Sequence, residues 1–403
     1  MAVAGEAALD SIGAAHSATP PQLAALDAFV DAFVRDQQVP GAALAVTYQS
    51  RLVYARGFGY ADAARKQPVR ATDLFRIASI SKAITATAIM QLIERRLLTI
   101  DAKVWEVLQL AEPTDTRWKS VTMAQLMNHT AGWDHEKFDI MFNDQHIAKA
   151  LKILLPIGTQ HIIQYMLTQR LHFDPGSQWG YSNFGYCLLG RVIERIAQMP
   201  YERYVQQQVF APLGIRRMRL GKTLASEKAA TEVTYFDDEP LKVAAVVGNI
   251  GQPVDLPYGS WSHENMDANG GWVGSAIDLV RFAAAFDNPK AYPILNERSI
   301  QAMFEDPGGA AGEVVDGSYV GLGWFVWPSD SYAHHAMTSS NGLRAGIATY
   351  LMRRRDGVNW AVLFNKRSDP DGKPLSYKFR DASAEAFNAV KRWPGGDLFP
   401  GLL

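Results

Sequence analysis

A serine hydroxyl and a lysine amine stand three positions apart in Ser79-Ile80-Ser81-Lys82, at the head of a long apolar segment. Side chains three positions apart share one face of a helix, so the Lys82 amine can reach the Ser79 oxygen. An amine in that place can take the hydroxyl proton and turn a weak nucleophile into a reactive one. The alternatives are a serine that only caps the helix and a lysine that lies in solvent. The spacing predicts a nucleophile that carries its own base.

The segment that follows, residues 83–98, predicts the helix that holds both groups. Its apolar residues repeat with the period of a buried stripe: Ile84, Ala88, Ile89, Leu92 and Ile93. A rigid, buried mount suits a catalytic group. Burial matters for Lys82 as well, because a lysine acts as a base near neutral pH only when its pKa falls from about 10.4.

A second pattern stands far from the first. Tyr181 and Asn183 form the only Tyr-x-Asn pattern of the chain, and Ser79 begins its only Ser-x-x-Lys pattern. These two patterns, in this order, resemble those of the serine β-lactamase and penicillin-binding-protein superfamily. Within it the likeness is to class C β-lactamases and their esterase relatives, the family VIII carboxylesterases.

Further segments similar to that family follow in the family's order along the chain. They are Val39–Ala43, Phe75–Ala78, Leu126–Trp133, Phe173–Tyr186, Gly270–Trp272 and Gly321–Trp324. A single short motif is weak support, whereas an ordered series over roughly residues 20–392 is hard to obtain by chance.

The resemblance implies a role for each residue of the two patterns. Ser79 would be the nucleophile, Lys82 the base or proton relay, and Tyr181 a phenol close to the serine oxygen. Tyr181 could deprotonate Ser79, then a water, and protonate the departing alcohol; as a base it would need a nearby cation, such as Lys82, to lower its pKa. Which of the two accepts the first proton stays open. Asn183 would orient Lys82 or the substrate carbonyl, or serve only as a turn residue.

The family's third motif departs from its pattern in this chain. The oxyanion hole would use the backbone N–H of Ser79 and a second N–H from a core strand. The usual Lys-Thr-Gly is absent, and the segment that lines up is Ser340-Asn341-Gly342-Leu343, which places the second donor near Leu343. Backbone donors do not depend on the side chain, so hydrolysis can persist without the motif lysine.

Three other basic residues lie near this motif. Arg344 could anchor a substrate carboxylate, although a surface arginine is the favoured interpretation. His334 and His335 suggest a Ser-His-Asp site, but neighbours on a strand point to opposite faces, so at most one could face the cleft. A core or surface histidine is favoured for both.

Other motifs of common enzyme sites are missing. The chain has no Gly-x-Ser-x-Gly turn and no His-Glu-x-x-His or similar spacing, so neither a metal nor another cofactor is expected. Four tryptophans lie near family segments and could line an acyl or alcohol pocket or belong to the core: Trp133, Trp179, Trp272 and Trp324.

The predicted fold is α/β (α+β), an antiparallel sheet flanked by helices with a mostly helical inserted domain. Helix and strand patterns come from both ends of the chain: a helix over 23–34, hairpins over 42–59 and 347–364, and a closing helix over 376–393. We expect a flexible tail over 1–20, an α/β domain from 21–76 together with 290–403, and a helical domain over 77–289.

Composition favours a globular enzyme. The 403 residues are 48% hydrophobic with a net charge of -1, which favours neither nucleic acid nor an anionic membrane as partner. The single cysteine, Cys187, excludes an internal disulfide. The first twenty residues lack the basic start and apolar stretch of a signal peptide, so we expect a cytoplasmic protein, or a periplasmic or secreted one if a leader has been removed.

The function predicted from these patterns is hydrolysis of carboxylic esters through a Ser79 acyl-enzyme, with Lys82 and Tyr181 as base and acid. A small-molecule ester or amide is the expected partner. The alternatives within enzymes are a β-lactamase, a D-amino-acid peptidase or amidase, and an acyltransferase. The alternative outside enzymes is a non-catalytic binding or filament-forming homologue, which has no reason to keep Ser79, Lys82 and Tyr181 together.

Overall fold

The computed structural model describes residues 20–402 except 63, 65, 237–241, 313, 315–316, 329–331 and 337–345; of residues 332–336 it describes the backbone. The predicted third motif, Ser340 to Leu343, and the neighbouring Arg344 therefore lie outside the described residues, as does most of the predicted tail.

An antiparallel sheet forms the core of the molecule. Within the described residues it has eight strands in the order β3-β2-β1-β13-β12-β11-β10-β9. Their bounds are β1 Gly41–Tyr48, β2 Arg51–Asp62, β3 Gln67–Pro68, β9 Tyr319–Val320, β10 Phe325–Trp327, β11 Tyr332–Ala336, β12 Ala348–Arg354 and β13 Val358–Phe364. Both predicted hairpins, β1–β2 and β12–β13, are confirmed. They join because β1 pairs with β13, with Ala42 opposite Phe364.

The turns explain why the hairpins form where they do. Gln49 and Ser50 both have positive φ, which is the backbone of a two-residue turn that matches the twist of its strands. Gly357 closes the second hairpin at φ +82°, a conformation that suits glycine after Asp356.

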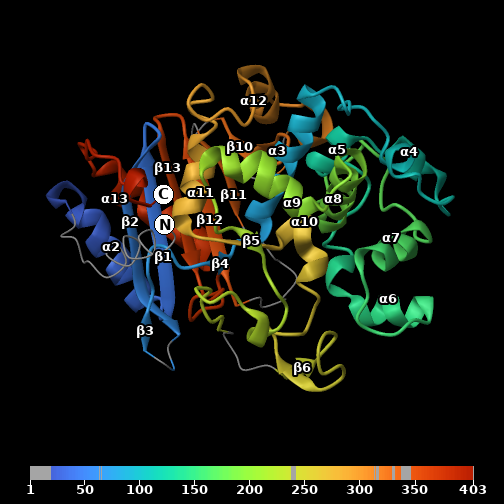
Figure 1. The fold of residues 1–403 in the computed structure, drawn as a ribbon, viewed down its shortest axis with the longest axis horizontal. Helices are drawn as coiled ribbons and strands as arrows, with labels where there is room; N and C mark the ends of the chain where they lie inside the picture. Colours follow the sequence, from blue (N-terminus) through green and yellow to red (C-terminus); the bar gives the residue numbers. More distant parts are fainter. Residues whose placement is uncertain are drawn as a thin grey trace.

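Helices cover both faces of this sheet (Figure 1). Successive residues of a strand point to opposite faces. Ala42, Leu44 and Val46 accordingly share one apolar cluster with α2 (Ala24–Asp36) and α13 (Leu375–Asn388). Their neighbours on β1 belong to a second, larger cluster with α11 (Ala276–Ala284) and the helical region.

The middle of the chain is mostly helical and lies beside the sheet in Figure 1. Its helices are α3 Ser81–Glu94, α4 Val104–Leu108, α5 Met123–Met127, α6 Asp144–Leu151, α7 Thr159–Leu167, α8 Asn183–Ala197, α9 Tyr201–Val205, α10 Asp267–Gly270 and α12 Glu297–Phe304. Short 3-10 or π turns are η1 Pro21–Leu23, η2 Ala78–Ile80, η3 Thr116–Ser120, η4 Ile140–Phe142, η5 Gln206–Phe210, η6 Ala211–Leu213, η7 Ala225–Glu227, η8 Glu264–Met266, η9 Gly309–Ala311 and η10 Phe399–Leu402. The described residues also form two small sheets. One has the strand order β4 Phe75–Arg76, β8 Trp272–Gly274 and β5 Arg219–Leu220, and the other pairs β6 Lys242–Ala244 with β7 Pro253–Asp255.

The predicted fold class is confirmed, with corrections at helix ends. The helix after Ser79 ends at Glu94 rather than residue 98, because Arg96 takes a positive φ that stops the helix. The helix is buried on every side through Leu92 rather than along one stripe. The closing helix ends at Asn388 rather than residue 393. The division into two domains stays a prediction; α11, inside the range assigned to the helical domain, contacts β1 and β13.

Candidate active site

Ser79 lies in the short turn η2 that leads into α3, and only 9% of its surface is exposed. The chain reaches it through β4, which pairs with β8, and through a hydrogen bond from the Ile77 N–H to the Trp272 carbonyl at 2.9 Å. Ala78 has φ +46°, a conformation that residues with a side chain rarely adopt. Such strained backbone persists where the surrounding structure holds it, and here it turns the chain sharply just before the candidate nucleophile.

Lys82 is fully buried and has three oxygen partners. Its Nζ lies 3.1 Å from Ser79 Oγ, 2.8 Å from Asn183 Oδ1 and 2.7 Å from the Asn269 carbonyl oxygen. An ammonium has three protons to donate, so this set satisfies it completely. None of the three partners is a carboxylate. Burial therefore lowers the pKa of Lys82 to about 7, against the opposing effect of the more distant Asp139 carboxylate.

Tyr181 reaches the same oxygen from another side. Its hydroxyl donates to Ser79 Oγ at 2.8 Å. The ring stacks on His129 at 4.3 Å between centroids and contacts His135 at 4.8 Å. Lys82 Nζ lies 4.9 Å from its centroid. Burial nevertheless raises the pKa of Tyr181, the opposite of the lowering that a tyrosine base would need, so the phenol is a proton donor at neutral pH.

Asn183 links the lysine to an acid. It is the first residue of α8, whose N-cap Ser182 accepts a hydrogen bond from the Gly185 N–H at 3.1 Å. While its Oδ1 accepts from Lys82, its Nδ2 donates to Asp139 Oδ2 at 2.7 Å. The structure thus brings together Ser79, Lys82, Tyr181 and Asn183, the four residues that the two sequence patterns predicted.

Two residues of this network were missed by the sequence reasoning. Asn269 contributes only a backbone carbonyl, for which no side-chain signal exists. Asp139 precedes η4, and its side chain accepts from the Met141 N–H as an N-cap. An aspartate before a short helix is common, so its spacing to Asn183 could not be read from the sequence.

Arg76 lies two residues before η2 and holds β4, the strand that leads to Ser79, in place. Its buried guanidinium donates to the carbonyls of Pro257 and Lys222 at 2.8 and 2.9 Å. It also lies 4.7 Å from the Tyr235 ring centroid. The strand before the nucleophile is thereby tied to a segment far along the chain.

The neighbourhood of the predicted second oxyanion donor is partly described. The turn η2 contacts both β11 and β12, and Thr349 Oγ1 donates to the Ile77 carbonyl at 3.3 Å. The segment between these strands, with Ser340 to Leu343, lies outside the described residues. His334 and His335 pair through their backbones with Met352 and Leu351 on β12.

The tryptophans mostly belong to the core. Trp133, Trp272 and Trp324 are at most 3% exposed. Trp133 contacts Trp118 at 4.7 Å between centroids. Trp179 is half-buried against Phe325. An acyl pocket built from all four is therefore not supported.

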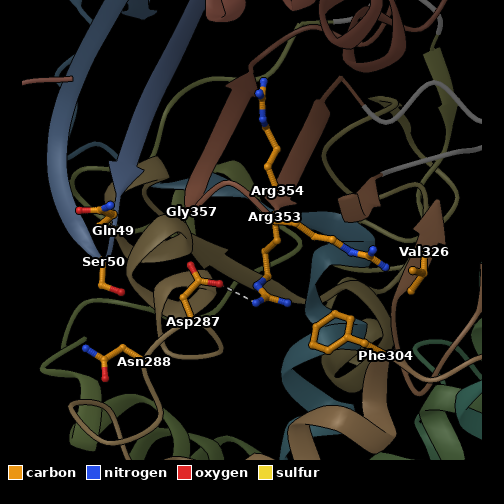
Figure 2. A pocket seen from close by; sticks show the side chains of 10 residues that line it. Gln49, Ser50, Asp287, Asn288, Phe304, Val326, Arg353, Arg354 and Gly357 are labelled. Carbon is orange, nitrogen blue, oxygen red and sulfur yellow. Dashed lines mark hydrogen bonds and ion pairs between the residues drawn. The ribbon is translucent and has the colours of Figure 1, made fainter. Parts of the chain in front are cut away.

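A cavity of about 600 Å³ lies at the end of β12 that is away from Ser79 (Figure 2). Figure 2 shows Arg353 directed at Asp287, and the two form an ion pair at 2.6 Å. Arg354 pairs with Asp356 at 2.6 Å. No serine–lysine–tyrosine cluster is among its lining residues. Size alone therefore does not identify the reactive site.

The described residues contain neither a cluster of metal ligands nor a membrane-spanning helix. Among them, no group of three or more His, Cys, Asp or Glu side chains is placed to hold a metal ion. In the same part of the chain, no helix is both long enough and apolar enough to span a membrane.

A buried serine between a lysine amine and a tyrosine hydroxyl, on this fold, defines the class of serine hydrolases to which penicillin-binding proteins belong. The Beta-lactamase family model matches residues 26–383, and the chain belongs to this family. The predicted superfamily is thereby confirmed.

Relatives and solved structures agree with this assignment. Esterase EstB of Burkholderia gladioli is 29% identical over 382 residues, covering 89% of this chain and 94% of EstB. Penicillin-binding protein 4* of Bacillus subtilis (strain 168) is 32% identical over 332 residues, covering 79% and 67%. The structure of EstCE1, a hydrolase with promiscuous acyltransferase activity, matches with a TM-score of 0.69 at 20% identity over 92% of this chain and 99% of that one. D-amino acid amidase from Ochrobactrum anthropi SV3 matches with a TM-score of 0.68, the same identity and the same coverage. These two likenesses show the fold alone.

Proposed function

We propose that this protein hydrolyses carboxylic esters through an acyl-enzyme on Ser79. The observation that carries the proposal is the position of Ser79 Oγ, 3.1 Å from a buried amine and 2.8 Å from a buried phenol. A nucleophile needs a group that takes its proton and a group that gives one to the leaving alcohol. Lys82 and Tyr181 have pKa shifts in opposite directions, which is what a base and an acid require.

The directions of the two pKa shifts indicate which residue is the base and which is the acid. Lys82, with a pKa of about 7, is neutral in a large fraction of molecules at neutral pH and is the base. Ser79 Oγ attacks the ester carbonyl carbon while its proton passes to Lys82. When the tetrahedral intermediate collapses, the departing alkoxide takes a proton from Tyr181, which recovers one from Lys82. Water then attacks the acyl carbon and gives a proton to Lys82. The bond from the acyl carbon to Ser79 Oγ breaks, the carboxylic acid leaves, and the proton returns to Ser79 Oγ.

The choice of esters rests on what the chain lacks and on one relative. β-Lactams and peptide C-termini carry a carboxylate, and a charged hydrogen bond to it is worth about 1.5–3 kcal/mol. The segment Ser340-Asn341-Gly342 offers no such charge in place of the family lysine. EstB, similar over 94% of its own length, is named an esterase. Both points favour a neutral ester over a cephalosporin or a D-alanyl peptide.

The nucleophile is tested by covalent labelling. A fluorophosphonate should add one label per chain, and peptide mapping should place it on Ser79. Ser79→Ala should lose the label and turnover. The matched control is Ser81→Ala, because Ser81 is also buried but its Oγ accepts from the Trp272 N–H. Label on another serine, or turnover in Ser79→Ala, would contradict the assignment.

The substrate class is tested with a panel of p-nitrophenyl esters, a chromogenic cephalosporin and D-alanyl peptides. We expect kcat/KM for a short neutral ester to exceed that for the cephalosporin by at least about 10²-fold, or roughly 2.7 kcal/mol in the transition state. Comparable values would refute the ester preference. If Arg344→Ala then removed only cephalosporin turnover, Arg344 would be the carboxylate anchor.

A further inference from the structure

Asp139 has no place in the two sequence patterns, yet it contacts the residue that holds Lys82. Its side chain is only 9% exposed, and its Oδ2 accepts from Asn183 Nδ2 at 2.7 Å. A buried carboxylate is costly unless it is hydrogen-bonded, so its partners indicate what it does. Besides Asn183 they are the Met141 N–H at 3.3 Å and the ring of His135, whose Nδ1 lies 3.7 Å from Oδ2.

The two ends of an amide have almost the same shape but opposite hydrogen-bonding character. If the Asn183 amide turned over, its NH₂ group would face the Lys82 amine, and two donors would meet. An ionised carboxylate only accepts, so Asp139 selects the orientation in which NH₂ faces away from Lys82. The oxygen is then the end that must face Nζ, as observed at 2.8 Å.

Packing alone does not hold this amide. Asn183 and Asp139 both line a cavity of about 90 Å³, together with His135, Trp133 and Phe184. Side chains beside a cavity lack partner atoms on one side and can rotate more freely. The amide is therefore held by its two hydrogen bonds, from Lys82 to Oδ1 and from Nδ2 to Asp139.

We propose that Asp139 is a positioning residue that acts through Asn183: it fixes the amide so that Oδ1 holds Lys82 Nζ beside Ser79. The inference rests on the proposed role of Ser79 as nucleophile and does not depend on the substrate class. Nothing in the geometry places Asp139 in contact with the reacting atoms.

The charge of Asp139 has a second, separable effect. Among the described residues, the groups that face Lys82 are the Ser79 hydroxyl, the rings of Tyr181 and Tyr186, the Asn183 amide and the Asn269 carbonyl, with Asp139 behind the amide. The Asp139 carboxylate raises the pKa of Lys82, against the lowering by burial. Removing its charge should lower that pKa, so the acidic limb of kcat/KM should move to lower pH.

The main variant is Asp139→Ser. Serine is a good N-cap and can still accept from the Met141 N–H, but it is too short to hold the Asn183 amide. We expect kcat, and the rate of fluorophosphonate labelling at Ser79, to fall by about 10-fold, because small misplacements of a catalytic group have effects of this size or larger. Asp139→Asn keeps an acceptor without the charge. It should retain kcat within about 3-fold and shift the acidic limb downward by up to about one pH unit.

A double-mutant cycle separates positioning through Asn183 from a general structural role. In an Asn183→Ala background, Asp139→Ser should change the labelling rate by less than 2-fold, because the amide that it positions is gone. Asn296→Ala, which removes the N-cap of α12, serves as a control for the loss of a cap. An unchanged labelling rate in Asp139→Ser, or an equal fall in both backgrounds, would overturn the proposal. If Ser79→Ala still turned over substrate, the proposed function would fail instead.

Discussion

Two buried cations at different points of the molecule have opposite surroundings. Lys82 is 0% exposed and is held by a hydroxyl, an amide oxygen and a carbonyl. Arg353, on β12, has a side chain that is 14% exposed and pairs directly with the Asp287 carboxylate (Figure 2). Its guanidinium also lies 4.5 Å from the ring centroid of Phe304. One cation has only neutral partners, and the other has an acid and an aromatic face.

Burial lowers the pKa of both groups, but with different consequences. An arginine has a very high pKa and keeps its proton in a protein, so Arg353 remains a permanent charge that needs its carboxylate. Lys82 reaches about 7, where it can accept and return a proton. A buried cation next to a carboxylate thus keeps its charge, whereas one kept from direct contact with carboxylates can act as a base.

The largest effect that this comparison predicts follows Lys82→Arg. A guanidinium at this site cannot lose its proton, and its larger head does not fit the three oxygen partners. We expect kcat for a p-nitrophenyl ester to fall by about 10³-fold, within the range known for general acid–base catalysis and mispacking together. In the wild type, kcat/KM should rise through about pH 7 as Lys82 loses its proton. Substantial activity in Lys82→Arg would show that Lys82 is not the base.

A somewhat smaller effect is expected from single losses in the proton network. Lys82→Ala and Tyr181→Phe should each lower kcat by about 10²-fold. Because both contact Ser79 Oγ, the double variant should lose less than the product of the two. Tyr186→Phe is the matched control: its ring lies near Lys82, but its hydroxyl donates to the Met127 carbonyl, so kcat should change little. Simple multiplicativity would mean that Lys82 and Tyr181 act independently.

The reciprocal exchange, Arg353→Lys, should change stability and leave the chemistry intact. Lysine keeps the charge but loses the planar fork that pairs with Asp287 and packs on Phe304. We expect the free energy of unfolding in urea to fall by about 1–2 kcal/mol. The ratio kcat/KM should stay within about 2-fold in the same preparation. A large loss of activity without a loss of stability would contradict the structural role.

The site around Lys82 could be predicted from the sequence to a large extent. Ser79 and Lys82 are three residues apart, so the geometry of a helix alone brings them together. Tyr181 and Asn183 lie far from them, and only the resemblance to a family placed them at the same site. The hairpins were predictable because their turns have local signals, such as Asp356-Gly357.

What could not be predicted depends on long-range contacts. Asp139 meets Asn183 across 44 positions of the chain, and Arg353 meets Asp287 across 66. No local pattern encodes which acid a given cation will meet. The direction of the pKa of Tyr181 could not be predicted either, because it depends on how deeply the fold buries the ring. Solvation is a property of the whole fold, and the sequence motif does not contain it.

The last effect that we predict is the slope of stability with pH that Lys82 should produce. Its pKa is about 7 in the folded protein and about 10.4 in the unfolded chain. Between these values the Lys82 side chain binds more protons in the unfolded chain, so its contribution to the free energy of unfolding should rise with pH. Burial of the ammonium therefore lowers the free energy of unfolding by its full amount below about pH 7, and this loss disappears above about pH 10.4.

Lys82→Met removes this penalty at every pH while leaving Asn183 Oδ1 without its donor. The two effects change the free energy of unfolding in opposite directions. The dependence of this change on pH is therefore the quantity to measure. We expect the free energy of unfolding of Lys82→Met, minus that of the wild type, to fall by about 1 kcal/mol per pH unit between pH 7 and 9. Urea unfolding at three pH values measures it. Lys242→Met, at a side chain that is 55% exposed, should give a curve parallel to the wild type. Parallel curves for Lys82→Met as well would mean that Lys82 keeps an ordinary pKa in the folded protein, and the contrast with Arg353 would then lose its physical basis.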